Sequence, residues 1–535
     1  MHLVNLVVAN HSRLQDLDIE VRKHLVLVGP NDVGKSSLLR CLELVLGAST
    51  AQLYSRLTPE DIRDPAQPLV IEAVLESFDS DDRALFPDEI TIDPTTQTES
   101  LTIRLEATVD ADQTVSINRR APGGGTNRQV SREQLAGVGW RLLAATSVTR
   151  DLREDRRTAL DDILQAVDLG AEKAQFDELV DQLRDQLKAS TVLDGLRGDL
   201  AGQLSKALPE QLGKDDLAFV PGATADDDVL SDVRLQVTKG GVQRNLAEQS
   251  DGMRALYAIA LYDLVSVGAN MVGIDEPEVH LHPTSQRSLA RLLQDGSNQK
   301  FLATHSADIV SAFTPDCIVS VRAGGLVVQP AANFLSPQEK MRVHWWVRDK
   351  LEPLTARRVL AVEGVSDRIL VQRVSDLTNR NLDRLGVSVV ETDGAGDMGA
   401  IVKLFGSAGF NVPLSMLIDL DAKAATADKL GVAEGDLGQH STFVSDPDLE
   451  AEYVAALGAG PVWSALTNSG LFSNNELNNC ASSGLGESRT AEDVAEFCRR
   501  KKYKVRAAMA VAPVLDATTA AAIASINALL IEVAQ

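Results

Sequence analysis

A glycine-rich segment near the N-terminus, Gly29–Ser36 (GPNDVGKS), has the residue types and spacing that bind phosphate groups. The apolar run VLVG (26–29) leads into it as a strand, and SLLRCLELVLG (37–47) follows it as a helix. Glycines let backbone N–H groups surround phosphate oxygens, a lysine reaches the outer phosphates, and a following hydroxyl can bind Mg²⁺. The helix N-terminus adds partial positive charge. We therefore expect ATP to be bound by Gly29, Asn31, Gly34, Lys35, Ser36 and Ser37, with Mg²⁺ on Ser36.

Two later strand ends carry groups suited to hydrolysis of a bound nucleotide. One apolar run ends in Asp275, which would hold Mg²⁺ through water, and Glu276, which would polarise the attacking water. A second apolar run ends in His305. This order of motifs, together with the phrase DEPEVHLHP (275–283), resembles the ABC-type ATPases, in the branch that includes the chromosome-maintenance and recombination ATPases. The resemblance makes Asp275 and His305 part of the ATP site.

The segment NLAEQSDGMRALYAIALY (245–262) could supply what an ABC-type site takes from a partner subunit. Ser250 would cap a helix, and Gly252 would allow close approach to a γ-phosphate. The sequence of this segment departs from the usual LSGGQ-like signature motif. The alternative interpretation is that the segment is an ordinary capped helix. The resemblance implies that one head cannot close its own site, and we therefore expect a homodimer or a higher homo-oligomer.

A separate series of carboxylates follows apolar runs in the C-terminal half. One run ends in Glu363, with Gly364 for a tight turn and Asp367 four residues on, and a later run ends in Asp419 and Asp421. Strand alternation predicts that Asp419 and Asp421 face one site at the carboxyl edge of a parallel sheet. Carboxylates so close repel each other unless a cation lies between them, and hard cations such as Mg²⁺ or Mn²⁺ favour oxygen ligands.

This series resembles the Toprim domain of topoisomerases, primases and certain nucleases. A further acidic pair, Asp448 and Glu450, is again two residues apart. Two metal ions about 3.5–4 Å apart can activate a water and stabilise the leaving oxygen of a phosphodiester. We expect the metal ligands to be Glu363, Asp367, Asp419, Asp421, Asp448 and Glu450.

The residue types favour hydrolysis by water over the other Toprim reactions. A topoisomerase needs a nucleophilic tyrosine with its own strand-passage domain, and the five tyrosines lie in no such domain. A primase would need polymerising machinery and usually a zinc module, which the four cysteines do not provide. Metal-dependent cleavage of DNA is the expected reaction. The alternative is an ATP-driven clamp or sensor whose Toprim-like domain only binds a partner or nucleic acid.

An ABC-type ATPase joined to a Toprim domain resembles the OLD (overcoming lysogenization defect) family of nucleases, a layout that the nuclease subunit of Gabija shares. The resemblance implies an ATPase-regulated DNA endonuclease in phage defence or DNA repair, acting alone or with a helicase partner. It also implies a late catalytic lysine, for which Lys504 is preferred to Lys501 and Lys502, with a general basic DNA-contact patch as the alternative. A lysine there would stabilise charge on the cleaved phosphate. The expected catalytic residues are Glu363, Asp419, Asp421 and Lys504, with Glu276 for ATP hydrolysis.

The order of strand and helix patterns predicts an α/β fold, with an N-terminal ABC-type P-loop ATPase and a C-terminal Toprim domain built on a Rossmann-like parallel sheet. A charged, leucine-containing stretch with helical spacing predicts a helical insertion, which is either a dimerisation arm or a decoration. The predicted boundaries are 1–150 and 216–330 for the ATPase, 151–215 for the insertion, 331–357 for a connector and 358–535 for the Toprim domain.

Length, composition and charge agree with this organisation. The 535 residues are enough for two or three domains, and 44% apolar with 24% charged residues is typical of a globular protein. No stretch reaches the roughly 20 apolar residues of a membrane helix. The four scattered cysteines favour a reducing cytoplasm. The net charge of −24 argues against non-specific coating of DNA but leaves room for a local basic channel.

Overall fold

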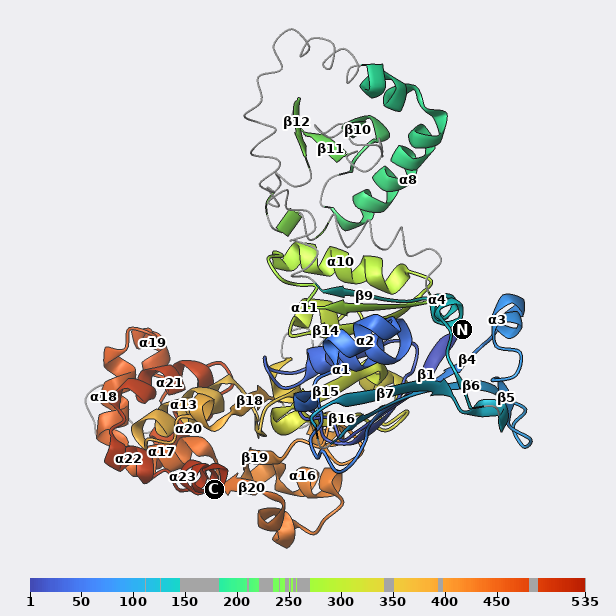
Figure 1. Ribbon diagram of the computed structural model, residues 1–535. Coiled ribbons are helices and arrows are strands. Elements are labelled where there is room, and N and C mark those ends of the chain that lie inside the picture. The colour runs from blue at the N-terminus through green and yellow to red at the C-terminus, as the bar shows by residue number, and fades with distance from the viewer. Residues whose placement is uncertain are drawn as a thin grey trace. The chain divides into compact units, whose positions relative to one another are not determined.

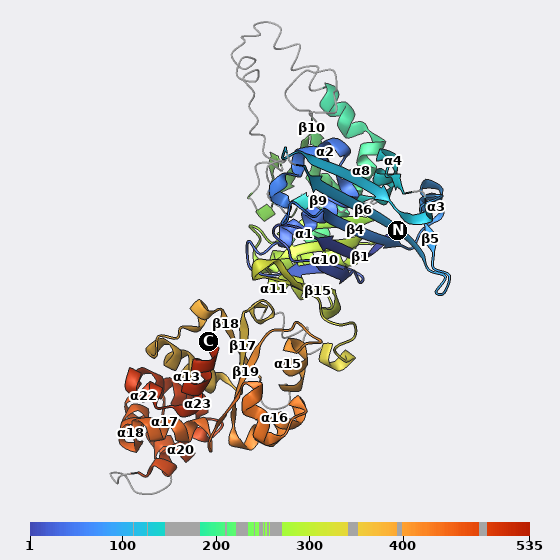
Figure 2. The same cartoon turned by 60° about the horizontal axis from the view of Figure 1, so that its bottom comes forward.

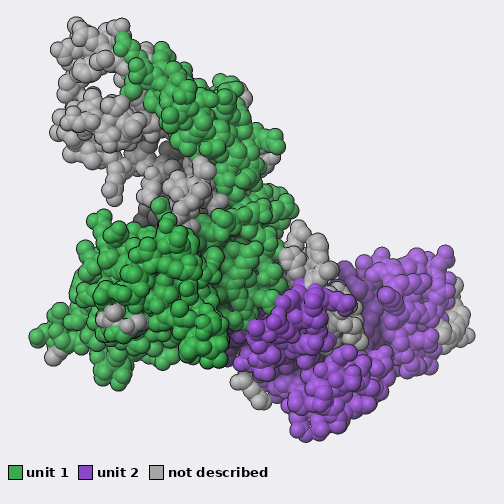
Figure 3. All heavy atoms as spheres, turned by 90° about the vertical axis from the view of Figure 1, so that its right-hand side faces the viewer, with its two compact units in different colours: residues 1–327, 347–349 green, residues 328–346, 350–535 purple. Residues whose placement is uncertain are grey.

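The chain forms two compact units in the computed structural model (Figure 3). The first contains residues 1–327 and 347–349, and the second contains residues 328–346 and 350–535. The structure describes residues 1–110, 112–125, 127–144, 182–208, 211–220, 234–239, 241–245, 250, 252, 253, 256, 270–340, 351–392, 398–480 and 489–534. Among these residues, no helix is both long and apolar enough to cross a membrane.

A parallel sheet carries the nucleotide motifs of the first unit. Its order is β16-β15-β3-β14-β13-β9, and the pairs β15–β3, β3–β14, β14–β13 and β13–β9 are parallel. The central strands are buried almost throughout, as expected for strands covered on both faces. The parallel arrangement places the carboxyl ends of β3, β14 and β13 next to one another. The strands are β3 (Leu25–Val28), β9 (Trp140–Ala144), β13 (Met271–Asp275), β14 (Gln299–Thr304), β15 (Ile318–Arg322) and β16 (Leu326–Val328).

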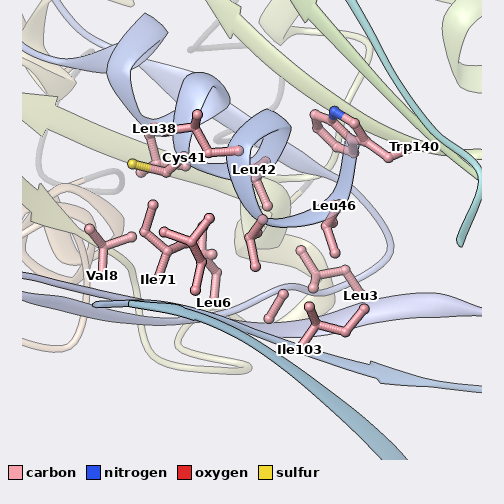
Figure 4. Packing of buried hydrophobic residues seen from close by; sticks show 14 of the residues in the cluster. Leu3, Leu6, Val8, Leu38, Cys41, Leu42, Leu46, Ile71, Ile103 and Trp140 are labelled. Atoms are coloured by element: carbon pink, nitrogen blue, oxygen red, sulfur yellow. The ribbon is translucent and has the colours of Figure 1, made fainter. Parts of the chain in front are cut away.

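An antiparallel sheet forms a second layer of the same unit, in the order β2-β1-β4-β6-β7-β8, with β5 paired to β6. Burial alternates along β4, so one face of this sheet points into the core. Helix α1 (Lys35–Leu42), which continues as the π-helical turn η1 (Glu43–Gly47), packs Leu38 and Leu42 towards Leu6 and Ile71 of the sheet (Figure 4). The strands are β1 (His2–Ala9), β2 (Leu17–Glu20), β4 (Leu69–Glu76), β5 (Thr91–Ile92), β6 (Glu99–Val109), β7 (Val115–Ala121) and β8 (Arg128–Gln129).

The remaining described elements of the first unit include six α-helices and a small sheet (Figure 1). The sheet joins β10 (Leu217–Val220), β11 (Arg234–Lys239) and β12 (Val242–Asn245) in antiparallel pairs. Residues 151–181 and 209–210 of the predicted insertion lie outside the described residues, and its described part includes α8. The helices are α2 (Thr50–Arg56), α3 (Ser80–Leu85), α4 (Arg132–Val138), α8 (Thr191–Ala207), α10 (Pro283–Asp295) and α11 (Ala307–Val310).

The second unit is built on a four-stranded parallel sheet in the order β18-β17-β19-β20. Its strands are β17 (Arg358–Val362), β18 (Val387–Glu391), β19 (Leu414–Asp419) and β20 (Thr442–Ser445). The chain passes from β17 to β18 on one side and returns to β19 on the other side of β17. The strand order therefore reverses between β17 and β19, and ligands of open α/β sheets bind at the carboxyl ends of strands at such a reversal.

Helices cover both faces of this sheet, with α15 and α16 on one face and α13, α17 and α23 on the other (Figure 2). Phe497 and Tyr503 stack with ring centroids 4.6 Å apart within the helical core. This stacking fixes the start of α21, whose first residue is Lys504. The helices are α13 (Val365–Leu377), α14 (Leu382–Leu385), α15 (Met398–Phe405), α16 (Lys423–Leu430), α17 (Leu449–Leu457), α18 (Ala459–Asn468), α19 (Asn474–Leu477), α20 (Ala491–Arg499), α21 (Lys504–Val511), α22 (Ala517–Ala521) and α23 (Ala524–Val533).

Candidate active sites

The phosphate-binding loop runs from the end of β3 to the start of α1, and its shape depends on two glycines. Gly34 has a φ of 113°, and a Cβ atom there would lie 2.7 Å from Leu14 Cδ2. A Cβ atom on Gly29 would lie 2.2 Å from the carbonyl oxygen of Val321. Only glycine fits both positions without a shift of the neighbours. Asn31 is exposed within the loop, and Ser37 is half-buried in the first turn of α1.

Lys35 is the first residue of α1, and its ammonium group contacts backbone oxygens of this loop. Its Nζ donates to the carbonyl oxygens of Gly29 at 2.8 Å and Pro30 at 2.7 Å. Burial lowers the pKa of Lys35, and the nearby acids Glu276, Glu278 and Asp275 act in the opposite direction. A triphosphate would give this ammonium group an anionic partner in place of neutral carbonyls.

The end of β13 meets the start of α1. Ser36 Oγ donates to Asp275 Oδ1 at 3.0 Å, which brings together the hydroxyl and the carboxylate predicted to serve a magnesium ion. Burial raises the pKa of Asp275, although the hydrogen bond from Ser36 counteracts this. Glu276 follows with a φ of 50°, which is uncommon for a residue with a side chain, and its N–H donates to Ala303 at 2.8 Å. Backbone strain of this kind is frequent at functional sites.

His305 follows β14, and its carboxylate partner is Glu278, a residue to which the sequence pattern assigned no role. Glu278 Oε1 accepts from the backbone N–H of His305 at 2.7 Å and lies 3.0 Å from its Nδ1. The glutamate side chain is 4% exposed, whereas the histidine side chain is 51% exposed. The sequence signal was available, since Glu278 is a third acid within four residues of the strand end, but its direction depends on the fold.

Ser250 and Gly252, the two residues of the predicted signature segment expected to act at the ATP site, are both described. Ser250 Oγ accepts from the N–H of Met253 at 3.4 Å, as a helix cap does. A Cβ atom on Gly252 would lie 2.4 Å from the carbonyl oxygen of His280, so this turn packs closely on the loop after β13. Asp251 lies outside the described residues.

The second site gathers carboxylates at the strand reversal of the Toprim-like sheet. Glu363 follows β17, Asp419 ends β19, and Asp421 lies in the 3-10 turn η10 (Leu420–Ala422). One oxygen from each carboxylate lies within 4.8 Å of the others. The backbone N–H of Asp419 donates to Glu363 Oε1 at 3.0 Å, which ties the two strand ends together. Burial raises the pKa of Glu363.

Lys504 reaches the same edge of the sheet from the start of α21. Its Nζ lies 3.1 Å from Asp419 Oδ2, 3.5 Å from Glu450 Oε2 and 4.0 Å from Asp367 Oδ1. Burial alone would lower the pKa of Lys504, but the surrounding carboxylates outweigh it and raise the pKa. Burial likewise raises the pKa of Asp367, and it raises that of Glu450 to about 7. The structure thus brings Lys504 to the carboxylates, whereas Lys501 and Lys502 are exposed.

Three details of the expected geometry differ. Strand alternation is not what joins Asp419 and Asp421, because β19 ends at Asp419 and a 3-10 turn delivers Asp421. Gly364 makes no strained turn, since its φ of −162° is extended backbone that any residue adopts. Asp448 and Glu450 do not lie on a strand either, because Asp448 caps α17 and Glu450 is in its first turn.

Both carboxylate oxygens of Asp448 have partners outside the cluster of Glu363, Asp419 and Asp421. Its Oδ1 accepts from the N–H of Ala451 at 2.7 Å, and its Oδ2 lies 2.8 Å from Arg499 Nε. Glu450, in contrast, is 1% exposed, and its Oε2 has no hydrogen-bond partner among the described residues. Oε2 of Glu450 instead forms an ion pair with Lys504. Arg499 was not singled out from the sequence, because its partner lies about 50 residues away.

These residues fit a divalent metal ion. The donor set consists of carboxylate oxygens, which hard cations prefer. Several carboxylates with raised pKa values surround a single lysine, so a further cation would relieve their repulsion. Glu363, Asp419 and Asp421 are the residues placed to hold it.

Comparison with known proteins matches each half of the chain to a domain family. Residues 25–311 match the family described as AAA domain, putative AbiEii toxin, Type IV TA system. Residues 354–421 match the family described as Overcoming lysogenization defect protein-like, TOPRIM domain. The two sites therefore define a P-loop ATPase joined to a Toprim domain.

Individual relatives share this combination. The OLD nuclease of Thermus scotoductus is 25% identical over 520 residues, which cover 86% of this chain and 92% of that protein. Endonuclease GajA of Bacillus cereus is 24% identical over 228 residues, which cover 40% of this chain and 38% of that protein. Among solved structures, the C-terminal region of the Burkholderia pseudomallei OLD protein is 25% identical, covers 33% of this chain and 96% of that chain, and has a TM-score of 0.28.

The chain belongs to the AAA domain family over residues 25–311, more than half of its length, and with its Toprim domain it is a member of the OLD family. The predicted family and the predicted fold class are thereby confirmed.

Proposed function

We propose that this chain is a divalent-metal-dependent DNA endonuclease whose cleavage is regulated by its ATPase. The observation that carries the proposal is the gathering of Glu363, Asp419 and Asp421 within 4.8 Å, with Lys504 against the same carboxylates. Similarity to the OLD nuclease of Thermus scotoductus over most of both chains supports the same reaction class.

In this proposal the Toprim residues divide the work of phosphodiester hydrolysis. Glu363, Asp419 and Asp421 hold Mg²⁺ or Mn²⁺. The bound metal supplies an activated water and stabilisation of the leaving oxygen. Asp367 and Glu450 keep Lys504 protonated, and its ammonium group stabilises charge on the phosphate being cut. Asp448, which caps α17 and faces Arg499, acts through the start of that helix.

The ATPase residues have a separate role in the proposal. Gly29, Gly34 and Lys35 hold the phosphates of ATP, and Ser36 with Asp275 holds its magnesium ion. Glu276 polarises the attacking water, and His305 senses the γ-phosphate. Ser250 and Gly252 complete the site of a second copy, so the working form is at least a homodimer.

The proposed setting is the cytoplasm, where the protein cuts DNA in phage defence or in repair. The four cysteines are buried free thiols, which is compatible with a reducing compartment. A helicase partner is part of this proposal only if cleavage by the isolated chain is weak and rises when that partner is added.

Nicking of supercoiled plasmid tests the proposal directly. Wild type and Lys35→Ala are incubated with Mg²⁺ or Mn²⁺, with and without ATP. We expect both proteins to nick in the presence of metal, and only wild type to change its rate when ATP is added. Absence of nicking with either metal, or equal activity in EDTA, would favour a clamp or sensor instead. Loss of all nicking in Lys35→Ala under every condition would contradict the separation of the two roles.

A further inference from the structure

Glu278 is a buried carboxylate in the ATPase unit that the proposed mechanism does not yet use. Its side chain is 4% exposed, and its Oε2 has no hydrogen-bond partner among the described residues. Its Oε1 accepts from the backbone N–H of His305 and also lies 3.0 Å from His305 Nδ1. Burying a carboxylate with one unpaired oxygen costs free energy of folding. An apolar residue would therefore pack at this position better than glutamate does.

The topology places this pair beside the phosphate-binding loop. Strand β14, which His305 follows, lies between β3, which leads into the loop, and β13, which ends in Asp275. In the register, Ala303 pairs with both Asp275 and Leu27. His305 therefore stands at the end of the loop where Lys35, Ser36 and Asp275 converge, which is where the outer phosphates of a nucleotide bind.

The contact with Glu278 determines which nitrogen of His305 carries the proton. A carboxylate only accepts hydrogen bonds, so Nδ1 must be the protonated nitrogen when it faces Oε1. Nε2 is then left for a ligand, and the histidine side chain is 51% exposed. A partner on one ring nitrogen that fixes the role of the other is a recurrent device in histidine chemistry.

We propose that Glu278 is a positioning residue for ATP hydrolysis, which holds the ring of His305 through its Nδ1–H so that Nε2 faces the γ-phosphate and donates to it once Nε2 is also protonated. This inference rests on the proposed ATPase function and adds a residue to it. Glu278 acts through His305 and does not touch the nucleotide.

Other contacts hold the local fold without Glu278. Ser306 Oγ donates to Gln286 Oε1 at 2.5 Å, and Arg287 Nη1 lies 2.9 Å from Asp308 Oδ1. The N–H of Ser306 also donates to Thr304 Oγ1 at 3.0 Å. These bonds tie α11 to α10 and keep the turn after β14 in place, so substitution of Glu278 should disturb the ring of His305 more than the backbone.

Two substitutions separate the hydrogen-bond acceptor from the charge. Glu278→Gln keeps an oxygen that can face Nδ1, whereas Glu278→Leu removes it. We expect Glu278→Leu to lower kcat for ATP hydrolysis about 10- to 100-fold with little change in nucleotide affinity, and Glu278→Gln to recover most of the rate. In the ¹⁵N spectrum of the histidine rings, the signal that His305→Ala removes should report Nδ1–H in wild type and in Glu278→Gln, and lose that preference in Glu278→Leu.

Two controls make the outcome decisive. Glu89→Leu removes another buried glutamate of the same unit that accepts a backbone N–H, and it should leave kcat unchanged. In a His305→Ala background, adding Glu278→Leu should cause no further loss. Equal slowing in that background, wild-type rates in Glu278→Leu, or equal losses in the Leu and Gln variants would overturn the proposal. If wild type hydrolyses no ATP, the proposed function fails, while the ring spectrum still tests the proton position.

Discussion

The two units each place a lysine from the start of a helix at the carboxyl edge of a parallel sheet, yet the two lysines face opposite surroundings. Lys35 donates to the neutral carbonyl oxygens of Gly29 and Pro30, and burial lowers its pKa. Lys504 lies among carboxylates, which raise its pKa despite burial. In the first site the ammonium group is bonded to neutral oxygens that a phosphate can replace, although acids lie nearby, whereas in the second site carboxylates contact the ammonium group directly and outnumber it. The first is therefore prepared for an anion and the second for a cation.

The two sites also differ in the chemical groups that would bind their ligands. The anion site relies on backbone, because loop N–H groups and a helix N-terminus bind phosphates. The cation site relies on side chains, because Glu363, Asp419 and Asp421 provide its oxygens. Replacing single carboxylates should therefore weaken ligand binding at the second site most. Replacing glycines that set the backbone conformation should weaken it most at the first site.

The largest effect should come from Asp419→Asn. Asp419 is hydrogen-bonded to two other residues of the site: its N–H donates to Glu363, and its Oδ2 accepts from Lys504. Loss of its charge should weaken metal binding and lower plasmid nicking about 10³-fold or more, equivalent to several kcal/mol of metal-derived stabilisation. ATP hydrolysis should continue. Calorimetric Mn²⁺ titration and plasmid nicking measure the two losses.

The matched control for this prediction is Asp428→Asn, which makes the same change at an exposed aspartate of α16. It should bind Mn²⁺ and nick like wild type. Undiminished Mn²⁺ affinity in Asp419→Asn would show that the carboxylate cluster is not the metal site.

Lys504→Met should give the next largest effect, and it should separate catalysis from metal binding. Removal of the ammonium group should lower nicking about 10²- to 10³-fold, the size found for a lost donor to a developing oxyanion. Mn²⁺ affinity should stay the same or increase, because a competing positive charge disappears from among the carboxylates. Lys502→Met, an exposed lysine two residues earlier, is the control and should keep most activity. Equal losses in the two variants would instead indicate a general DNA-contact patch.

The sequence predicted the strand ends well and side-chain directions poorly. Acids and a histidine after apolar runs had to meet at sheet edges, because parallel strands share a carboxyl edge. Asp421 reaches its site through a 3-10 turn, which depends on β19 ending one residue before the turn starts. The carboxylate of Asp448 contacts Arg499, and that of Glu278 contacts His305, and both partners are distant in the sequence. Such contacts follow from tertiary packing, and the sequence around each residue contains no pattern that predicts them.

A pair of glycine substitutions tests the reliance on backbone. Gly34→Ala puts a side chain where φ is 113° and where Leu14 Cδ2 lies 2.7 Å away, so we expect a loss of about 1–3 kcal/mol in unfolding free energy. ATP affinity should fall about tenfold, equivalent to 1.4 kcal/mol. Gly364→Ala has extended backbone and no atom within 4 Å of its new Cβ, so stability should change by about 0.5 kcal/mol or less. Denaturant unfolding and nucleotide titration measure both; equal tolerance at the two positions would contradict the contrast.

The smallest effect should follow from Asp448→Asn, and it decides whether this residue belongs to the cation site. Asparagine caps a helix about as well as aspartate, so α17 should persist. What disappears is the charge facing Arg499, a partly buried ion pair worth about 1 kcal/mol. Arg499→Gln removes the same pair from the other side. If Asp448 acts only through the start of α17, both variants should lower nicking by a similar few-fold and leave Mn²⁺ affinity unchanged. If Asp448 is a metal ligand, Asp448→Asn alone should lose Mn²⁺ affinity as Asp419→Asn does, and the cation site would then extend to the end of β20.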